Sequence, residues 1–193
     1  MTGALRIGIL GVGNVLMSDD GVGPYILKIL ESRYEFPDRV TLLDLGTPGL
    51  GITSFFADYD SIILIDAVSG NRQPGSVHLY RKGQLVRVPV PHRVSPHDPA
   101  LVESLLFAEL SGKCPGEVLL VGIAPDTVEL GCEITERVRA ATEPAIGAIL
   151  AELARLGVEP RVRERPVRPS IWWRENVFSG SPAREDHVSG NPR

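Results

Sequence analysis

Short, continuously apolar runs alternate with amphipathic stretches along most of the chain. The apolar runs lack polar alternation, which is the pattern of strands buried on both faces of a parallel sheet. They occupy residues 5–10, 40–45, 61–65 and 118–123. The stretches between them carry apolar residues three or four positions apart, as amphipathic helices do. These stretches are 22–30, 101–110 and 134–156. Strands that alternate with helices predict a doubly wound α/β protein, with a mainly parallel sheet covered by helices on both faces.

Four local features refine this prediction. Residues 75–81 alternate polar and apolar side chains, which favours an antiparallel or edge strand. Residues 52–57 fit a short helix or turn. Pro24 suits the first position of a helix. Pro144 lies inside the last amphipathic stretch and should kink it or divide it in two.

The composition changes near residue 159. From there to residue 193 the chain is rich in Arg and Pro, and we expect this tail to be largely irregular. The Ile-Trp-Trp sequence at 171–173 could nevertheless pack onto the rest of the protein or contact a partner. We therefore predict one domain over residues 1–158 and a tail over residues 159–193.

Charge and cysteine content narrow the class of protein. The net charge is −4, which argues against a general nucleic-acid binder. Cys114 and Cys132 are too few for a disulfide scaffold and fit a reducing compartment. No apolar stretch approaches the ~20 residues of a membrane span. The apolar start runs into Asp19 and Asp20 without the pattern of a signal peptide, so we expect a cytoplasmic protein.

Acidic and imidazole groups follow the predicted strands. Asp19 and Asp20 come after the first strand, Asp66 ends the central one, and His97 lies in a Pro-rich loop. Sites in open parallel sheets form outside the carboxyl ends of the strands, so these groups are expected to gather there. Two carboxylates and one imidazole suit a divalent first-row metal such as Ni²⁺, Zn²⁺ or Mn²⁺.

Each of these residues also has a structural interpretation. Asp20 could stabilise a helix N-terminus through the helix dipole, and Asp19 or Ser18 could cap that helix. A lone histidine such as His97 is more often a loop residue than a ligand. Asp66 is harder to explain in this way, because a carboxylate buried without partners costs free energy.

The first strand and its glycines also suggest a nucleotide site. Gly11-Val12-Gly13, with Asp44 at the end of the second strand, resembles the opening of a dinucleotide-binding fold. The third glycine of that fingerprint is replaced by Leu16, and Asp19 and Asp20 would repel a pyrophosphate. An oxidoreductase therefore stays as an alternative hypothesis. No GxSxG motif supports a serine hydrolase.

Four segments resemble, in order, the motifs of the [NiFe]-hydrogenase maturation endopeptidases. They are GVGNVLMSDDGVG at 11–23, LDLGTPG at 43–49, IDA at 65–67 and SPH at 95–97. Residues 119–125 and Glu129 are similar to the late strand and loop of that family. The order and separations of the motifs agree over about residues 5–157.

This resemblance implies a fold, an activity and a site. The fold is a three-layer α/β/α sandwich of the phosphorylase/hydrolase-like type, with a twisted, mainly parallel sheet. The activity is removal of a C-terminal extension from the hydrogenase large-subunit precursor after nickel insertion. The matching metal-binding positions are Asp20, Asp66 and His97. The precursor itself would supply the nickel, and no nucleotide is implied. The Arg/Pro tail exceeds the usual family length.

The residues are compatible with that chemistry. A peptidase without a serine or cysteine nucleophile must polarise the peptide carbonyl or activate water, and a metal can do either. A carboxylate could also act as general base. A third hypothesis, from another functional class, is a non-catalytic maturation carrier that docks the precursor through its tail.

Overall fold

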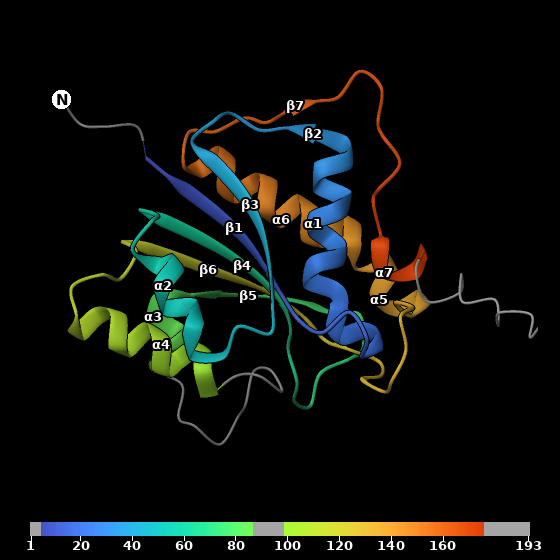
Figure 1. Ribbon diagram of the computed structural model, residues 1–193, viewed down its shortest axis with the longest axis horizontal. Coiled ribbons are helices and arrows are strands. Elements are labelled where there is room, and N and C mark those ends of the chain that lie inside the picture. The colour runs from blue at the N-terminus through green and yellow to red at the C-terminus, as the bar shows by residue number, and fades with distance from the viewer. Residues whose placement is uncertain (1–4, 87–98, 176–193) are drawn as a thin grey trace, which may run out of the picture.

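The computed structural model describes residues 5–86 and 99–175. Its centre is a five-stranded sheet (Figure 1). From edge to edge the strands are β3 (Val40–Gly46), β1 (Ile7–Val12), β4 (Ser61–Ala67), β6 (Glu117–Ile123) and β5 (Val77–Arg81). β1 pairs in parallel with β3 and β4, and β4 pairs in parallel with β6. β5 is an antiparallel edge strand. Both the mainly parallel sheet and the antiparallel edge strand were predicted from the sequence and are confirmed.

Helices cover both faces of the sheet, as Figure 1 shows. One face carries α1 (Val22–Arg33), α5 (Glu136–Ala140) and α6 (Thr142–Arg155). The other carries η2 (Gly49–Ile52), α2 (Thr53–Phe56), α3 (Lys82–Leu85) and α4 (Pro99–Leu110). Every residue of β1 and β4 is buried between these layers, which explains why residues 7–12 and 62–65 are continuously apolar. The predicted α/β/α sandwich is confirmed.

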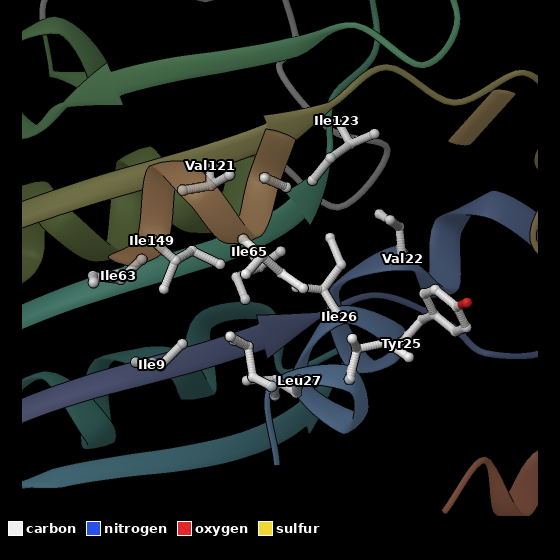
Figure 2. Close-up of a cluster of buried hydrophobic side chains, with 14 of the residues drawn as sticks. Ile9, Val22, Tyr25, Ile26, Leu27, Ile63, Ile65, Val121, Ile123 and Ile149 are labelled. Atoms are coloured by element: carbon white, nitrogen blue, oxygen red, sulfur yellow. The ribbon is translucent and has the colours of Figure 1, made fainter. Parts of the chain in front are cut away.

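Each face of the sheet has its own apolar core. Figure 2 shows the larger one, where Ile26 of α1 and Ile149 of α6 pack with Ile65 and Val121 of the central strands. β-branched residues such as these suit a pleated surface that is covered on both sides. The two cores hold the sheet rigidly, so the loops at the carboxyl ends of the strands start from fixed points.

Two prolines lie in the first turns of helices. Pro144 is the third residue of α6, and the predicted division of the last amphipathic stretch occurs just before that helix, at Ala141. The sequence predicts Pro24 at the first position of a helix, but it is the third residue of α1. In both positions the missing N–H has no intrahelical acceptor to lose. Within the described ranges, no helix has the length and apolar character needed to cross a membrane.

The chain after residue 158 packs against the domain up to residue 175. β7 (Arg161–Val162) pairs with β2 (Tyr34–Glu35) in a small antiparallel ribbon. α7 (Trp172–Glu175) is a single turn whose Trp173 is only 2% exposed and belongs to the larger core. The stretch is mostly irregular, yet Trp173 packs into the core, whereas Trp172 is half exposed. The division of the chain at residue 158 stays a prediction.

Candidate active site

The loop after β1 carries the first candidate carboxylate. Gly13 has a φ of +137°, and a Cβ there would lie 1.8 Å from the carbonyl oxygen of Asp20. Only glycine permits this approach, which folds the loop back onto the turn η1 (Ser18–Gly21). The backbone N–H of Asn14 donates to Oδ2 of Asp20 at 2.8 Å. Asp20 is 2% exposed, so its carboxylate is held just beyond the end of β1.

Asp66 lies near the carboxyl end of the neighbouring strand β4. It is 5% exposed, and Oδ1 accepts a hydrogen bond from the Ala67 amide at 2.8 Å. η1 lies against β4. A Cβ on Gly23 would be 2.3 Å from the Val12 oxygen and 2.4 Å from the Ile65 oxygen. This close approach of α1 to both strands places Asp20 and Asp66 at the same corner of the sheet.

The third predicted site residue cannot be placed beside them. His97, with its neighbours in the SPH segment, lies outside the described residues. Within residues 5–86 and 99–175, no group of three or more His, Cys, Asp or Glu side chains is arranged to hold a metal ion. The structure therefore places the two described carboxylates of the predicted set beside the carboxyl ends of the adjacent strands β1 and β4, and their role as ligands stays a prediction.

Asp19 has a different environment from the aspartate beside it. It is fully buried and accepts four hydrogen bonds. Its Oδ2 accepts from the amides of Asp126 and Thr127 at 3.0 and 3.2 Å, and from the Thr135 hydroxyl at 2.9 Å. Its Oδ1 accepts from the Thr135 amide at 2.7 Å. Asp19 thus fastens the first motif to the loop after β6.

Backbone hydrogen bonds reinforce the same connection. Met17 forms an isolated bridge with Gly131, with the Ser18 amide donating to the Gly131 oxygen at 2.7 Å. The Gly131 amide donates back to Leu16 at 2.9 Å, and the Ser18 hydroxyl donates to the Glu129 oxygen at 2.9 Å. Neither η1 nor α1 has a side-chain N-cap, so the capping interpretation of Ser18 and Asp19 is wrong. These residues bind a distant loop instead.

A cavity of about 400 Å³ adjoins this corner. Residues 13–15 of the first motif and 44–47 of the second form most of its wall. The Gly46 amide donates to Oδ1 of Asp44 at 3.0 Å, and the Gly13 amide donates to the Gly46 oxygen at 2.8 Å. These bonds join the two motifs. The other lining residue in the described part of the chain is Trp172, from the segment that the sequence assigned to the tail.

The two cysteines and His78 lie in surroundings that suit a structural role. Cys114 and Cys132 are free and half-buried, and burial raises the pKa of the Cys114 thiol. A thiol with a raised pKa is a poor nucleophile at neutral pH. His78 bonds with the Ser76 hydroxyl at 2.8 Å on the edge strand, and burial together with Arg72 lowers its pKa.

Comparison with known proteins identifies the family. The hydrogenase maturation protease family model matches residues 24–152, and the chain therefore belongs to that family. It is 37% identical over 161 residues to the hydrogenase 2 maturation protease of Escherichia coli K12, covering 83% of this chain and 98% of that one. It is 39% identical over 166 residues to the hydrogenase expression/formation protein HupM of Azotobacter chroococcum, covering 85% and 79%.

Solved structures agree with this membership. The hydrogenase maturating endopeptidase HybD from E. coli matches with a TM-score of 0.74 at 35% identity, over 82% of this chain and 98% of that one. The [NiFe] hydrogenase maturation protease HybD from Thermococcus kodakarensis matches with a TM-score of 0.63 at 27% identity, over 78% and 99%. The chain is accordingly a hydrogenase maturation protease, an endopeptidase, and the oxidoreductase alternative has no support among these relatives.

Proposed function

We propose that this protein removes the C-terminal extension of a [NiFe]-hydrogenase large-subunit precursor once nickel has been inserted. Asp20, Asp66 and His97 bind the nickel carried by the precursor. One observation supports this proposal above the others. Two buried carboxylates, from motifs far apart in the sequence, lie at one corner of the sheet in a chain of the protease family.

The surroundings of the two carboxylates suit a cation that arrives with the substrate. Both are nearly buried, and charge interactions strengthen where water is scarce. Oxygen ligands combined with an imidazole suit a divalent first-row metal. Bound nickel polarises a peptide carbonyl or lowers the pKa of a coordinated water. The Asn14 amide orients the Asp20 carboxylate, so the ligand is positioned before the substrate arrives.

This arrangement makes cleavage depend on nickel insertion. A precursor that lacks nickel offers no cation to Asp20, Asp66 and His97, so its scissile bond is not activated there. The partner is thus the large-subunit precursor, and nickel is part of the substrate.

The test is the intact mass of the cognate precursor, nickel-loaded and nickel-free, after incubation with the protein. We expect loss of a C-terminal peptide from the loaded form alone. Asp20→Asn and Asp66→Asn should each abolish the cut while leaving folding nearly intact, because a neutral amide is a much poorer metal ligand than a carboxylate. Asp58→Asn is the matched control, because Asp58 is exposed before β4, at the opposite end of that strand.

Each other result has a definite meaning. Cleavage of both precursor forms would keep the protease and discard the nickel sensor. Normal cleavage by Asp66→Asn would remove Asp66 from the mechanism. A stable complex without any mass loss would contradict the proposal and favour the non-catalytic carrier.

A further inference from the structure

We infer that Trp172 forms one wall of a substrate subsite, which receives a bulky apolar side chain of the precursor beside the scissile bond. This inference rests on the proposed function, since the substrate is a polypeptide whose cut lies near Asp20. It assigns a specificity role to a residue from the C-terminal segment, which none of the sequence motifs includes.

The cavity beside Trp172 adjoins the loop that holds Asp20. Asn14 lines the cavity and also donates its amide to Oδ2 of Asp20 at 2.8 Å. Gly13, whose backbone lies against the Asp20 carbonyl, lines it as well. A peptide with its scissile bond at Asp20 therefore has its neighbouring residues within reach of this space.

Trp172 is held in place by its neighbours while its own ring stays accessible. Trp173 is buried in the larger core and packs edge-on against Trp172, with ring centroids 5.7 Å apart. Arg174 lies 5.8 Å from the centre of the Tyr25 ring and forms an ion pair with Glu133 at 2.6 Å. Trp172 itself is 50% exposed. A rigid indole of this kind can bind a partner at little cost in conformational entropy.

The lining indicates what the cavity accepts. Trp172, Val15 and Leu45 supply apolar surface, and the lining residues that the structure describes include no Lys, Arg or His. Oδ1 of Asp44 accepts the Gly46 amide and shapes the turn. Asn14 and Thr47 are polar and lie where they can bond a peptide backbone. A volume of about 400 Å³ suits one large side chain with its adjoining main chain.

The first test is kinetic, with nickel-loaded precursor as substrate. Trp172→Ala should raise KM about tenfold with kcat within about twofold, because it removes binding energy away from the reacting bond. Trp172→Phe should recover most of that loss. The matched control is Leu110→Ala, which removes an exposed apolar side chain from the end of α4 and should leave KM unchanged. A drop in kcat alone for Trp172→Ala, or an equal effect of Leu110→Ala, would overturn the inference.

The second test identifies the occupant by coupling. Bulky apolar residues that flank the cut in the precursor are changed singly to serine. At one of these positions the change should raise KM for the unaltered protease about tenfold, and have little further effect on Trp172→Ala, because both changes remove the same contact. Additive effects at every position would refute the subsite.

The third test does not need cleavage. The chain has two tryptophans, and Trp173 is buried, so quenching by acrylamide reports mainly on Trp172. An excess of nickel-free precursor should lower the quenching constant about twofold, and the Trp172→Phe variant should lack this change. Unchanged quenching in a complex shown by co-migration would overturn the inference. So would a Trp172 that is already shielded in the free protein. If no precursor form is ever cut, the proposed function fails, and this measurement still decides whether Trp172 meets the precursor.

Discussion

Removing the charge of Glu152 should destabilise the protein by an amount that depends on pH. Glu152 is a buried residue of α6. Arg81 of the edge strand β5 binds its two carboxylate oxygens at 2.6 and 2.7 Å, and Arg155 binds them at 2.8 and 3.0 Å. Although burial alone raises the pKa of Glu152, hydrogen bonds and charge interactions with the two arginines outweigh it and lower the pKa from 4.5 to about 2.

The size of the effect follows from that pKa. A carboxyl group whose pKa is lower in the folded protein stabilises the fold above its unfolded pKa, and loses this contribution as pH falls through the folded pKa. For Glu152 the contribution is about 3 kcal/mol at neutral pH and disappears between about pH 5 and pH 2. The side chains of Arg81 and Arg155 are 49% and 43% exposed, so water screens the pairs. We expect Glu152→Gln to cost about 2 kcal/mol at pH 7.

The assay is urea unfolding at pH 7 and at about pH 3, with far-UV circular dichroism as the signal. The difference between the unaltered protein and Glu152→Gln should shrink by more than half at the lower pH. Glu143→Gln is the control in the same helix, because Glu143 pairs with Arg33 at the surface and should cost less than about 1 kcal/mol. An equal loss for Glu152→Gln at both pH values would refute the reasoning, since packing rather than charge would then explain it.

Three further substitutions, one of them with a matched control, test the scaffold of the site. Gly13→Ala should lower the free energy of unfolding by at least about 3 kcal/mol and abolish cleavage, because its Cβ would collide with the Asp20 carbonyl oxygen. The control is Gly147→Ala, in α6 with open space around it, which should instead stabilise the protein by about 0.5–1 kcal/mol. Equal melting temperatures for the two variants would contradict both expectations. Asp19→Ala should lower the free energy of unfolding by about 2–4 kcal/mol and reduce activity, because several buried donors lose their acceptor. An unchanged denaturant midpoint would show that the loop after β6 does not depend on the Asp19 carboxylate. Trp173→Ala should cost about 3–5 kcal/mol in the same measurement, and a loss below about 1 kcal/mol would mean that α7 does not contribute to the core.

Sequence periodicity predicted the sheet well because burial decides both the pattern and the structure. β1 and β4 are buried along their whole length, and their sequences are correspondingly apolar except for Ser61 and Asp66 of β4. β5 forms an edge of the sheet, and its alternating polar and apolar residues predict an edge strand. The two-residue strands β2 and β7 escaped prediction, because so short a pairing leaves no periodic signal.

The candidate site was predictable only in part. Topology alone was enough to expect Asp20 and Asp66 at one edge of the sheet, since parallel neighbouring strands end on the same side. The partners of Asp19 were not predictable. Thr135 lies 116 positions away, and hydrogen bonds over such separations leave no local pattern. The sequence places Trp172 in the tail, but nothing in the sequence connects it with the cavity between the first two motifs.

The two adjacent aspartates of the first motif have different roles in the structure of the site. The Asp19 carboxylate is bound by the loop after β6, whereas Asp20 receives the amide of Asn14 within its own loop. One residue therefore fixes the turn, and the next presents a carboxylate from a turn that is already fixed. A carboxylate presented in this way needs little reorganisation when a cation arrives, which favours binding. The late loop, although it supplies no predicted ligand, thus determines where Asp20 lies.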